Sequence, residues 1–485
     1  MAEASQSVFK KLMFGVRRKR KIVDTFESIH KLFLIVLVIK LRKLNFIYVW
    51  GEDIPAPIVD FSSIIGIPEQ LLKNLQEFDI TGPTPIQMQA ITIMLQRRDL
   101  LASAPTGSGK TLAFVIPLIL QIIKRKARLK SQTVHSLYAV ILEPTRELSK
   151  QTYMQCLKFA QNLPVTCVFM TENEFLDSAD IIVSTPNKLA FLLNEPKIKA
   201  RWLIVDESDR LFETTEGSEK CFRNQLAIIY QACCGKYIRR AFFSATFSYD
   251  VEEWCKENIL NLSMVCIGER NSTVNTVKQE LIFSGSEHGK VLALEYLLRE
   301  RFEPPALIFV QSKDRARQLI SEIGTFRPYI PAALISSEKS EKERDEAIRR
   351  FREGTIWVLV CTELMGRGLD LMGVNLVVNF DLPTSIISYI HRIGRTGRAG
   401  RSGRAITYFT ESDINIVRPI ANIIKQAGFS VPEYIFKVRD RKKILRFIPK
   451  RKNIGAIKKR KETKNNNSSS ENCWFKKNSV KNEPL

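Results

Sequence analysis

The sequence is poor in the residues that build metal sites and disulfide frameworks. It has nine cysteines but no C-x-x-C pair, and only four histidines among 485 residues. Cysteines without such spacing in a chain of this length are typical of a reducing compartment, and they argue against a structural zinc site. Long apolar runs are missing too: the strongest, Leu32 to Ile39, is far shorter than the roughly 20 residues that span a bilayer. We therefore expect no membrane anchor, and either a short strand or a buried helical turn at this run.

Acidic residues are too few to balance the basic ones, because 74 Lys and Arg face 51 Asp and Glu, which gives a net charge of +23. Residues 10–21 hold seven basic side chains and no acid, and residues 437–464 hold fourteen against two. Such tails usually contact polyanions, most often nucleic acid, although either tail alone could equally be a nuclear-import signal or a solubilising arm. The Asn- and Ser-rich residues 465–470 are predicted to be disordered.

Between the tails the composition is that of an ordinary soluble protein, and the length suits two α/β domains. Short aliphatic and β-branched runs alternate with longer helix-like segments, which predicts two parallel sheets covered by helices on both faces. A polar stretch from Gly268 to Thr276 separates the two series. The predicted strands are residues 138–142, 181–184, 202–205 and 241–244 in the first series, and 306–310, 332–335, 357–361, 376–379 and 405–409 in the second.

A glycine-rich segment between an apolar run and a helix-like run fits a phosphate-binding loop. Its glycines let backbone N–H groups converge on phosphate oxygens, Lys110 can reach the β- and γ-phosphates, and Thr111 can ligate Mg²⁺. We therefore expect a nucleoside triphosphate site, the alternative being a plain strand-to-helix turn. The loop residues are Ala104, Pro105, Thr106, Gly107, Ser108, Gly109, Lys110 and Thr111.

Two acids follow the apolar residues 203–205, where a buried strand is expected to end. Asp206 would hold Mg²⁺ through water, and Glu207 would orient and deprotonate the attacking water. An Asp-Glu pair by itself is usually a helix cap. Together with the phosphate loop, however, the pair indicates a nucleotide-hydrolysing site.

The second half of the chain supplies clustered arginines from His391 to Arg398. Arg395 and Arg398 could act as arginine fingers on the terminal phosphate, an effect worth on the order of 10³ in rate. The alternative is a basic nucleic-acid surface, because Arg401 and Arg404 extend the series.

Taken in order, these motifs resemble those of the DEAD-box family of RNA-dependent ATPases, over about residues 61–432. The further matching segments are PTPIQ at 83–87 with the upstream aromatic Phe61, PTREL at 144–148, TP at 185–186, DESD at 206–209, SAT at 244–246, and the second-half segments 307–312, 362–370 and 391–398.

This resemblance implies two RecA-like domains, residues 61–268 and 278–436, which close on ATP and RNA together. The remaining divisions are a basic extension at 1–60, a linker at 269–277 and a basic low-complexity tail at 437–485. The resemblance further implies that Gln87 reads the adenine, that Asp370 contacts the ribose, and that Phe61 belongs to the same nucleotide site. RNA would be touched by Thr145, Arg146, Thr185, Arg344 and Thr362, and ATP would be coupled to closure by Ser244, Thr246 and His391.

Several positions depart from the family pattern. Ser208 replaces an alanine, and both working carboxylates of the motif remain. Lys188 stands where an arginine is usual, which keeps the charge but loses the planar fork that grips phosphate. Glu341 takes the place of a glutamine three residues before Arg344, so an anion lies near the expected RNA backbone. A glycine pair usual between the PTREL and TP motifs is missing from residues 165–180.

The main hypothesis is therefore an ATP- and Mg²⁺-dependent RNA helicase or remodeller whose ATPase is stimulated by RNA. The DESD variant resembles a subfamily that acts in nucleolar assembly of the small ribosomal subunit. That resemblance implies pre-ribosomal RNA and pre-ribosomal proteins as partners, a nuclear and nucleolar location, and a monomer that contacts no membrane. An ATP-locked RNA clamp or assembly scaffold is the alternative, and a DNA helicase is a third possibility.

Overall fold

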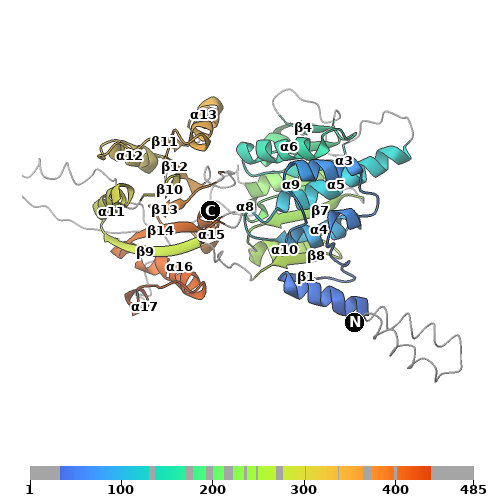
Figure 1. Cartoon of the computed structure of the whole chain (residues 1–485), viewed down its shortest axis with the longest axis horizontal. Helices are drawn as coiled ribbons and strands as arrows, with labels where there is room; N and C mark the ends of the chain where they lie inside the picture. The colour runs from blue at the N-terminus through green and yellow to red at the C-terminus, as the bar shows by residue number, and fades with distance from the viewer. Residues whose placement is uncertain are drawn as a thin grey trace, which may run out of the picture.

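The computed structural model describes two α/β domains, each built around its own sheet (Figure 1). The residues that it describes are 33–129, 137–170, 179–192, 200–211, 222–233, 237–246, 249–268, 277–300, 302–336, 338–363, 371, 373–397 and 401–437. The linker expected at 269–277 lies outside them except for its last residue, as do the basic segment 10–21, all but the first residue of the basic tail at 437–485, and the low-complexity residues 465–470.

The first sheet has eight strands in the order β1-β8-β2-β7-β6-β3-β5-β4. All neighbours are parallel except β1, which runs antiparallel to β8. The strands are β1 Ile47–Trp50, β2 Leu100–Ser103, β3 Ala139–Leu142, β4 Cys167–Phe169, β5 Ile181–Ser184, β6 Trp202–Val205, β7 Arg239–Ser244 and β8 Ser263–Ile267. The helices are η1 Phe61–Ser63, α3 Glu69–Glu77, α4 Pro85–Leu95, α5 Lys110–Arg128, α6 Arg146–Ala160, α7 Pro186–Leu192, α8 Ser208–Leu211, α9 Phe222–Ala232 and α10 Tyr249–Asn258.

The second sheet has six strands in the order β11-β12-β10-β13-β14-β9, and all neighbours are parallel. The strands are β9 Val277–Gly285, β10 Ala306–Val310, β11 Ala332–Ile335, β12 Val358–Thr362, β13 Leu376–Asn379 and β14 Gly403–Thr410. The helices are α11 Glu287–Glu300, α12 Lys313–Ile323, α13 Glu341–Arg352, α15 Ile386–Ile393, η3 Glu411–Asp413, α16 Ile414–Gln426 and α17 Tyr434–Lys437.

Both faces of each sheet are buried, which explains the continuous apolar strands. In the first domain α3 to α6 cover one face, and α7, α9 and α10 cover the other. Successive strand residues enter opposite cores: Leu100 and Ala102 pack on the first face, and Leu101 packs on the second. The second sheet is covered in the same way by α13, α15 and α16 on one face and by α11 and α12 on the other. The predicted fold class, two tandem parallel-sheet domains, is confirmed.

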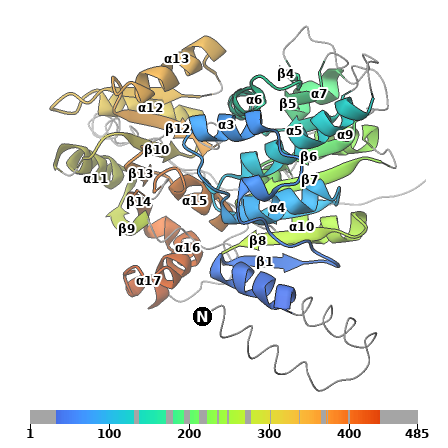
Figure 2. The same ribbon diagram turned by 45° about the vertical axis from the view of Figure 1, so that its right-hand side comes forward.

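The N-terminal segment differs from expectation. Residues 33–44 are helical and lead into β1, so a segment from the expected extension completes the first sheet (Figure 2). The apolar run is wrong as a short strand or a buried turn, because Phe33, Ile35 and Val36 are each more than half exposed. The run forms a helix, but most of its apolar side chains are not covered by a core, because α3 to α6 already pack on the adjoining face of the first sheet. None of the helices in the described parts of the chain combines the length and hydropathy that a membrane crossing requires.

Candidate functional site

The expected phosphate loop connects β2 to α5. Gly107 and Gly109 both have positive φ values, +79° and +86°, and a Cβ on Gly109 would collide with the amide of Gln87. No side chain caps α5, so the backbone N–H groups of its first turn face the loop without a side-chain acceptor. This arrangement suits an anion, because the positive end of the helix dipole points at the loop.

The side chains of the loop are arranged to receive charge. Lys110 is 7% exposed, and its Nζ donates to the carbonyl oxygen of Ala104 at 2.9 Å. The hydroxyl of Ser108 is buried and makes no hydrogen bond within the described residues. A bound phosphate would give both groups an acceptor, so the loop fits a polyphosphate. Thr111 lies one residue further, in the first turn of α5.

The adenine-reading candidate Gln87 joins α4 to this loop. Its Oε1 accepts a hydrogen bond from the backbone N–H of Thr84 at 3.0 Å, and its Nε2 donates to the carbonyl oxygen of Gly109, also at 3.0 Å. Phe61, the aromatic residue expected to accompany it, is buried in η1. The position of α4 therefore sets where Gln87 stands beside the nucleotide loop.

The acidic pair lies where β6 ends, at the same edge of the parallel sheet as the phosphate loop. The carboxylate of Asp206 accepts a hydrogen bond from the N–H of Glu207 at 2.8 Å. Glu207 has a φ of +46°, in the left-handed region that a residue with a side chain rarely adopts. Such backbone strain persists at functional sites where the surrounding structure enforces it. Thr111 and Asp206 offer only oxygen donors, which is the donor chemistry that Mg²⁺ takes.

Burial dominates the electrostatics of these carboxyl groups. It raises the pKa of Asp206 to about 7, helped by the charge of Glu207 and opposed by that of Lys110. Burial and the charge of Asp206 likewise raise the pKa of Glu143 well above its ordinary value. Glu143 follows β3 at the same sheet edge and accepts a hydrogen bond from the Thr152 hydroxyl at 2.6 Å. No sequence pattern indicated Glu143, since only the fold brings it beside Asp206.

The raised pKa of Asp206 implies that this carboxyl group destabilises the nucleotide-free protein. At a pH between 3.8, the ordinary pKa of an aspartate, and about 7, Asp206 is more fully protonated in the folded chain than in the unfolded chain. Stability is therefore lost as the pH rises across that window, and the loss is complete above about pH 7. We expect Asp206→Asn to raise the free energy of unfolding at pH 8 by up to roughly 4 kcal/mol, and the gain to vanish near pH 4.

Thermal unfolding of the nucleotide-free chain at pH 8, 7, 6 and 5 measures this difference. Asp314→Asn is the matched control, because its side chain is 75% exposed and pairs with Arg317 at the surface. A gain in melting temperature for Asp206→Asn that is the same at every pH would contradict the explanation.

Asp209 is one of the residues that link the two domains at this site. Its Oδ1 accepts a hydrogen bond from the Ser244 hydroxyl at 2.6 Å, and its Oδ2 lies 3.6 Å from Nδ1 of His391 in the second domain. The Thr246 N–H donates to the same Ser244 hydroxyl at 3.1 Å. Ser244 and His391 therefore meet at one carboxylate, and Thr246 joins them through the Ser244 hydroxyl. The sequence assigned Asp209 no role, and its place in DESD was the only signal for it.

Helix α15 lies on the side of the second domain that faces the first (Figure 1), and its end contacts the phosphate loop. Nε2 of His391 lies 3.9 Å from the Glu207 carboxylate, and the Thr106 hydroxyl donates to the carbonyl oxygen of Gly394 at 3.2 Å. Arg395 follows, 3% exposed, and its Nε donates to the carbonyl oxygen of His391. Glu207, Asp209 and His391 each place a ligand atom within 4.8 Å of the others. Arg398 and Asp370 lie outside the described residues.

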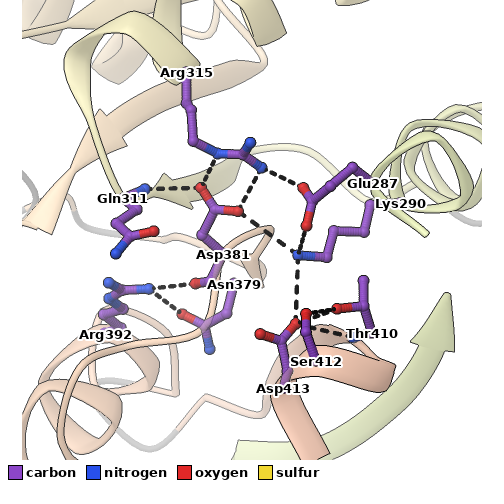
Figure 3. Close-up of polar contacts among 10 residues, drawn as sticks. All are labelled: Glu287, Lys290, Gln311, Arg315, Asn379, Asp381, Arg392, Thr410, Ser412 and Asp413. Carbon is purple, nitrogen blue, oxygen red and sulfur yellow. Dashed lines mark hydrogen bonds and ion pairs between the residues drawn. The ribbon is translucent and has the colours of Figure 1, made fainter. Parts of the chain in front are cut away.

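A buried ionic network contacts α15 through Arg392 (Figure 3). Arg392 donates to the backbone carbonyl oxygen of Asp381 at 2.8 Å. The Asp381 carboxylate, fully buried, accepts hydrogen bonds from Arg315 and from the N–H of Gln311. The network also contains Glu287, Lys290 and Asp413. Buried charges need such pairing, and here the pairing fixes α15, the helix that leads into Arg395.

Both expected RNA-contacting arginines pair with acids across the domain boundary, where the start of α6 faces the start of α13. Arg146 lies 2.9 Å from Glu341, and Arg344 lies 2.9 Å from Glu147. A third pair joins Lys150 to Asp345 at 2.7 Å. The sequence did not predict Glu147 as a partner.

The three expected RNA-contacting threonines have less specific surroundings. Thr145 caps α6, where its hydroxyl accepts a hydrogen bond from the N–H of Leu148 at 3.3 Å. Thr185 directly precedes α7, and Thr362 ends β12 and is half-buried. The structure thus places Thr145 and Arg146 together at one helix start, and the other two at the carboxyl ends of separate strands.

Comparison with known proteins covers both domains. A sequence profile described as DEAD/DEAH box helicase matches residues 84–254, and one described as helicase conserved C-terminal domain matches residues 289–400. The rat protein named probable ATP-dependent RNA helicase DDX52 is 45% identical over 417 residues, which cover 81% of this chain and 68% of the relative. The Kluyveromyces lactis protein named ATP-dependent RNA helicase ROK1 is 38% identical over 422 residues, covering 82% and 70%.

Solved structures show the same two-domain arrangement. S. cerevisiae Dbp5 bound to RNA and ADP BeF3 is 27% identical, with a TM-score of 0.65, and the match covers 77% of this chain and 94% of that one.

Proposed function

The chain belongs to the DEAD/DEAH-box family of ATP-dependent RNA helicases, and from this premise we propose that RNA stimulates its ATP hydrolysis and that the cycle remodels RNA. The observation that carries the proposal is the meeting of three parts in one place. The phosphate loop, the acidic pair and the end of α15 come from distant parts of the chain, yet Thr106 contacts Gly394 and Glu207 lies beside His391.

The residues have distinct tasks in the proposed reaction. The loop N–H groups and Lys110 bind the triphosphate, and Glu207 accepts the proton of the attacking water. Arg395 and Arg398 stabilise the charge that develops on the terminal phosphate. Magnesium, when bound, neutralises phosphate charge, and Thr111 with Asp206 would hold it. Gln87, Phe61 and Asp370 would bind the nucleoside.

Turnover with and without single-stranded RNA tests this function. We propose that RNA raises kcat and that matched DNA competes poorly, because only RNA offers the 2′-hydroxyl. Equal turnover with and without RNA, in soluble protein that binds ATP, would reject the proposal. Effective competition by DNA would favour a DNA helicase instead.

Glu341 is proposed to weaken RNA binding. Its carboxylate pairs with Arg146, which would otherwise be free to bind a backbone phosphate. We expect Glu341→Gln to lower the Kd for single-stranded RNA several-fold, and to steepen the dependence of log K on log salt by about 0.7, the increment for one phosphate contact.

Fluorescence anisotropy across a salt series measures both quantities. Glu353→Gln is the matched control, because it lies just past the other end of α13 and pairs with Arg349 within the same domain. Weaker RNA binding by Glu341→Gln would show that the ion pair helps closure instead.

An ATP-locked clamp is the second candidate, favoured by the three ion pairs between α6 and α13. Such pairs would stabilise a closed state whatever the rate of hydrolysis. A clamp predicts that function in cells survives a hydrolysis-deficient variant, whereas a remodeller predicts that it is lost.

We propose a role in ribosomal RNA processing and small-subunit assembly, in the nucleolus, with pre-ribosomal RNA and proteins as partners. The support is similarity to the subfamily with DESD in its second motif, together with basic tails suited to RNA. Crosslinking the protein to RNA in cells and sequencing the attached RNA tests this assignment; enrichment of RNA other than pre-ribosomal RNA would reject it.

A further inference from the structure

The N-terminal helix, residues 33–44, contacts the first domain through Leu41, which packs against its core, and through the half-buried Arg42. Nε of Arg42 donates to Oε1 of Gln89 in α4 at 2.9 Å. Its Nη2 donates to the backbone carbonyl oxygens of Pro55 at 2.8 Å and Ile54 at 3.3 Å. A single guanidinium group therefore joins three pieces of chain: the N-terminal helix, the segment after β1, and α4.

Gln89 depends on this contact because its side chain is completely buried. Its Nε2 donates to the carbonyl oxygen of Pro55 at 2.9 Å, the same oxygen that Arg42 binds. Within the described residues, the hydrogen bond that the Gln89 Oε1 atom accepts comes from Arg42. A buried amide oxygen without a donor is unfavourable, so loss of Arg42 would favour movement of Gln89 and of the helix that carries it.

The helix concerned is the one that carries the adenine-reading candidate. Gln87 lies two residues before Gln89, and residues two apart on a helix point to different sides. One side of α4 therefore holds Gln87 against Gly109, and another holds Gln89 against the N-terminal segment. A backbone hydrogen bond from Ile58 to the Met88 carbonyl oxygen, 2.9 Å long, fastens the segment to the same turn.

We propose that Arg42 is a positioning residue for adenine recognition, acting through Gln89 and α4 on Gln87. The inference rests on the proposed function, in which Gln87 reads the adenine. The N-terminal segment is then a brace for the nucleotide site, and it lies before residue 84, where the match to the helicase profile begins. A brace of this kind changes how firmly the base is held, and it leaves the hydrolytic groups in place.

Nucleotide binding by the full chain, without RNA, tests the proposal. Fluorescent analogues of ADP and GDP are titrated against the parent, Arg42→Met and Arg42→Lys. We expect Arg42→Met to raise the Kd for the ADP analogue roughly tenfold and to leave the Kd for the GDP analogue nearly unchanged, since one buried hydrogen bond corresponds to about that factor. Arg42→Lys, which keeps one donor, should recover part of the loss.

Arg98→Met is the matched control, because Arg98 binds the same N-terminal segment at the Asp53 and Glu52 carbonyl oxygens without touching Gln89. We expect it to leave the preference for adenine intact. In the double variant Arg42→Met with Gln89→Met, the effect should be smaller than the sum of the two, since no amide oxygen is then left unsatisfied.

The proposal is overturned by unchanged ADP binding in Arg42→Met, by equal weakening of ADP and GDP binding, or by the same loss in Arg98→Met. Melting temperatures of all variants are compared. If both arginine variants remain folded and Arg42→Lys binds ADP as weakly as Arg42→Met, that result also counts against the proposal.

A parent that binds ADP but shows no RNA-stimulated turnover would contradict the proposed function alone, because the binding data still decide the role of Arg42. A parent that binds neither nucleotide would overturn both.

Discussion

Glu207→Gln is expected to lower kcat of the RNA-stimulated ATPase by about 10² to 10⁴, the usual contribution of a general base, while ATP still binds. Glu207 is 8% exposed at the sheet edge that carries the phosphate loop, and its backbone, with a φ of +46°, is strained just after the end of β6. The neutral amide keeps the shape of the side chain but cannot accept a proton.

Steady-state turnover and the Kd for an ATP analogue separate the two effects. Glu69→Gln is a control at the surface of the same domain, where its side chain is 81% exposed and pairs with Lys73. We expect the Kd of Glu207→Gln to stay within about threefold of the parent, because the loop and Lys110 remain intact. A variant that turns over at the parent rate would remove Glu207 from its role.

The sequence predicted most of the central strands, although it missed β8, and of the edge strands β1, β4, β9 and β11 it predicted β11 alone. Strands such as β3 and β10 are buried on both faces, so every residue is apolar and the run is easy to recognise. The edge strands β4 and β9 were missed: β4 has three half-buried residues, and β9 mixes buried with exposed positions. At an edge, one strand has fewer neighbours to cover it, and the apolar signal weakens.

Within the site, the sequence located the parts that lie on one short segment and missed those that need docking. The phosphate loop and the acids are contiguous motifs, so their chemistry can be inferred from spacing. The pair of Arg344 with Glu147 joins residues 197 apart, and that of Asp209 with His391 crosses the domain boundary. Contacts of this kind depend on how two folded domains meet, which no local pattern encodes.

Arg395→Ala is expected to lower kcat by about 10³, the effect of removing an arginine finger, with little change in the KM for ATP. Arg395 is 3% exposed and follows Gly394, whose carbonyl oxygen is hydrogen-bonded to the phosphate loop. Its Nε donates to the carbonyl oxygen of His391, which orients the rest of the guanidinium group. Arg395→Lys should recover little of the rate, because a lysine lacks the planar fork that matches phosphate oxygens.

The competing explanation, a basic surface for nucleic acid, predicts a different pattern of loss. Two arginines, Arg401 and Arg404, extend the series. Arg404 donates two hydrogen bonds to Glu280, whereas Arg401 is exposed, so Arg401 is the better control. If the series served only to bind RNA, Arg401→Ala and Arg395→Ala would both raise the Kd for RNA and spare kcat at saturating RNA. If Arg395 acts on the terminal phosphate, its loss lowers kcat at saturating ATP and RNA, whereas Arg401→Ala leaves kcat intact. Turnover at saturating RNA therefore decides between an arginine finger and a binding surface, because only the finger is required after both ligands are bound.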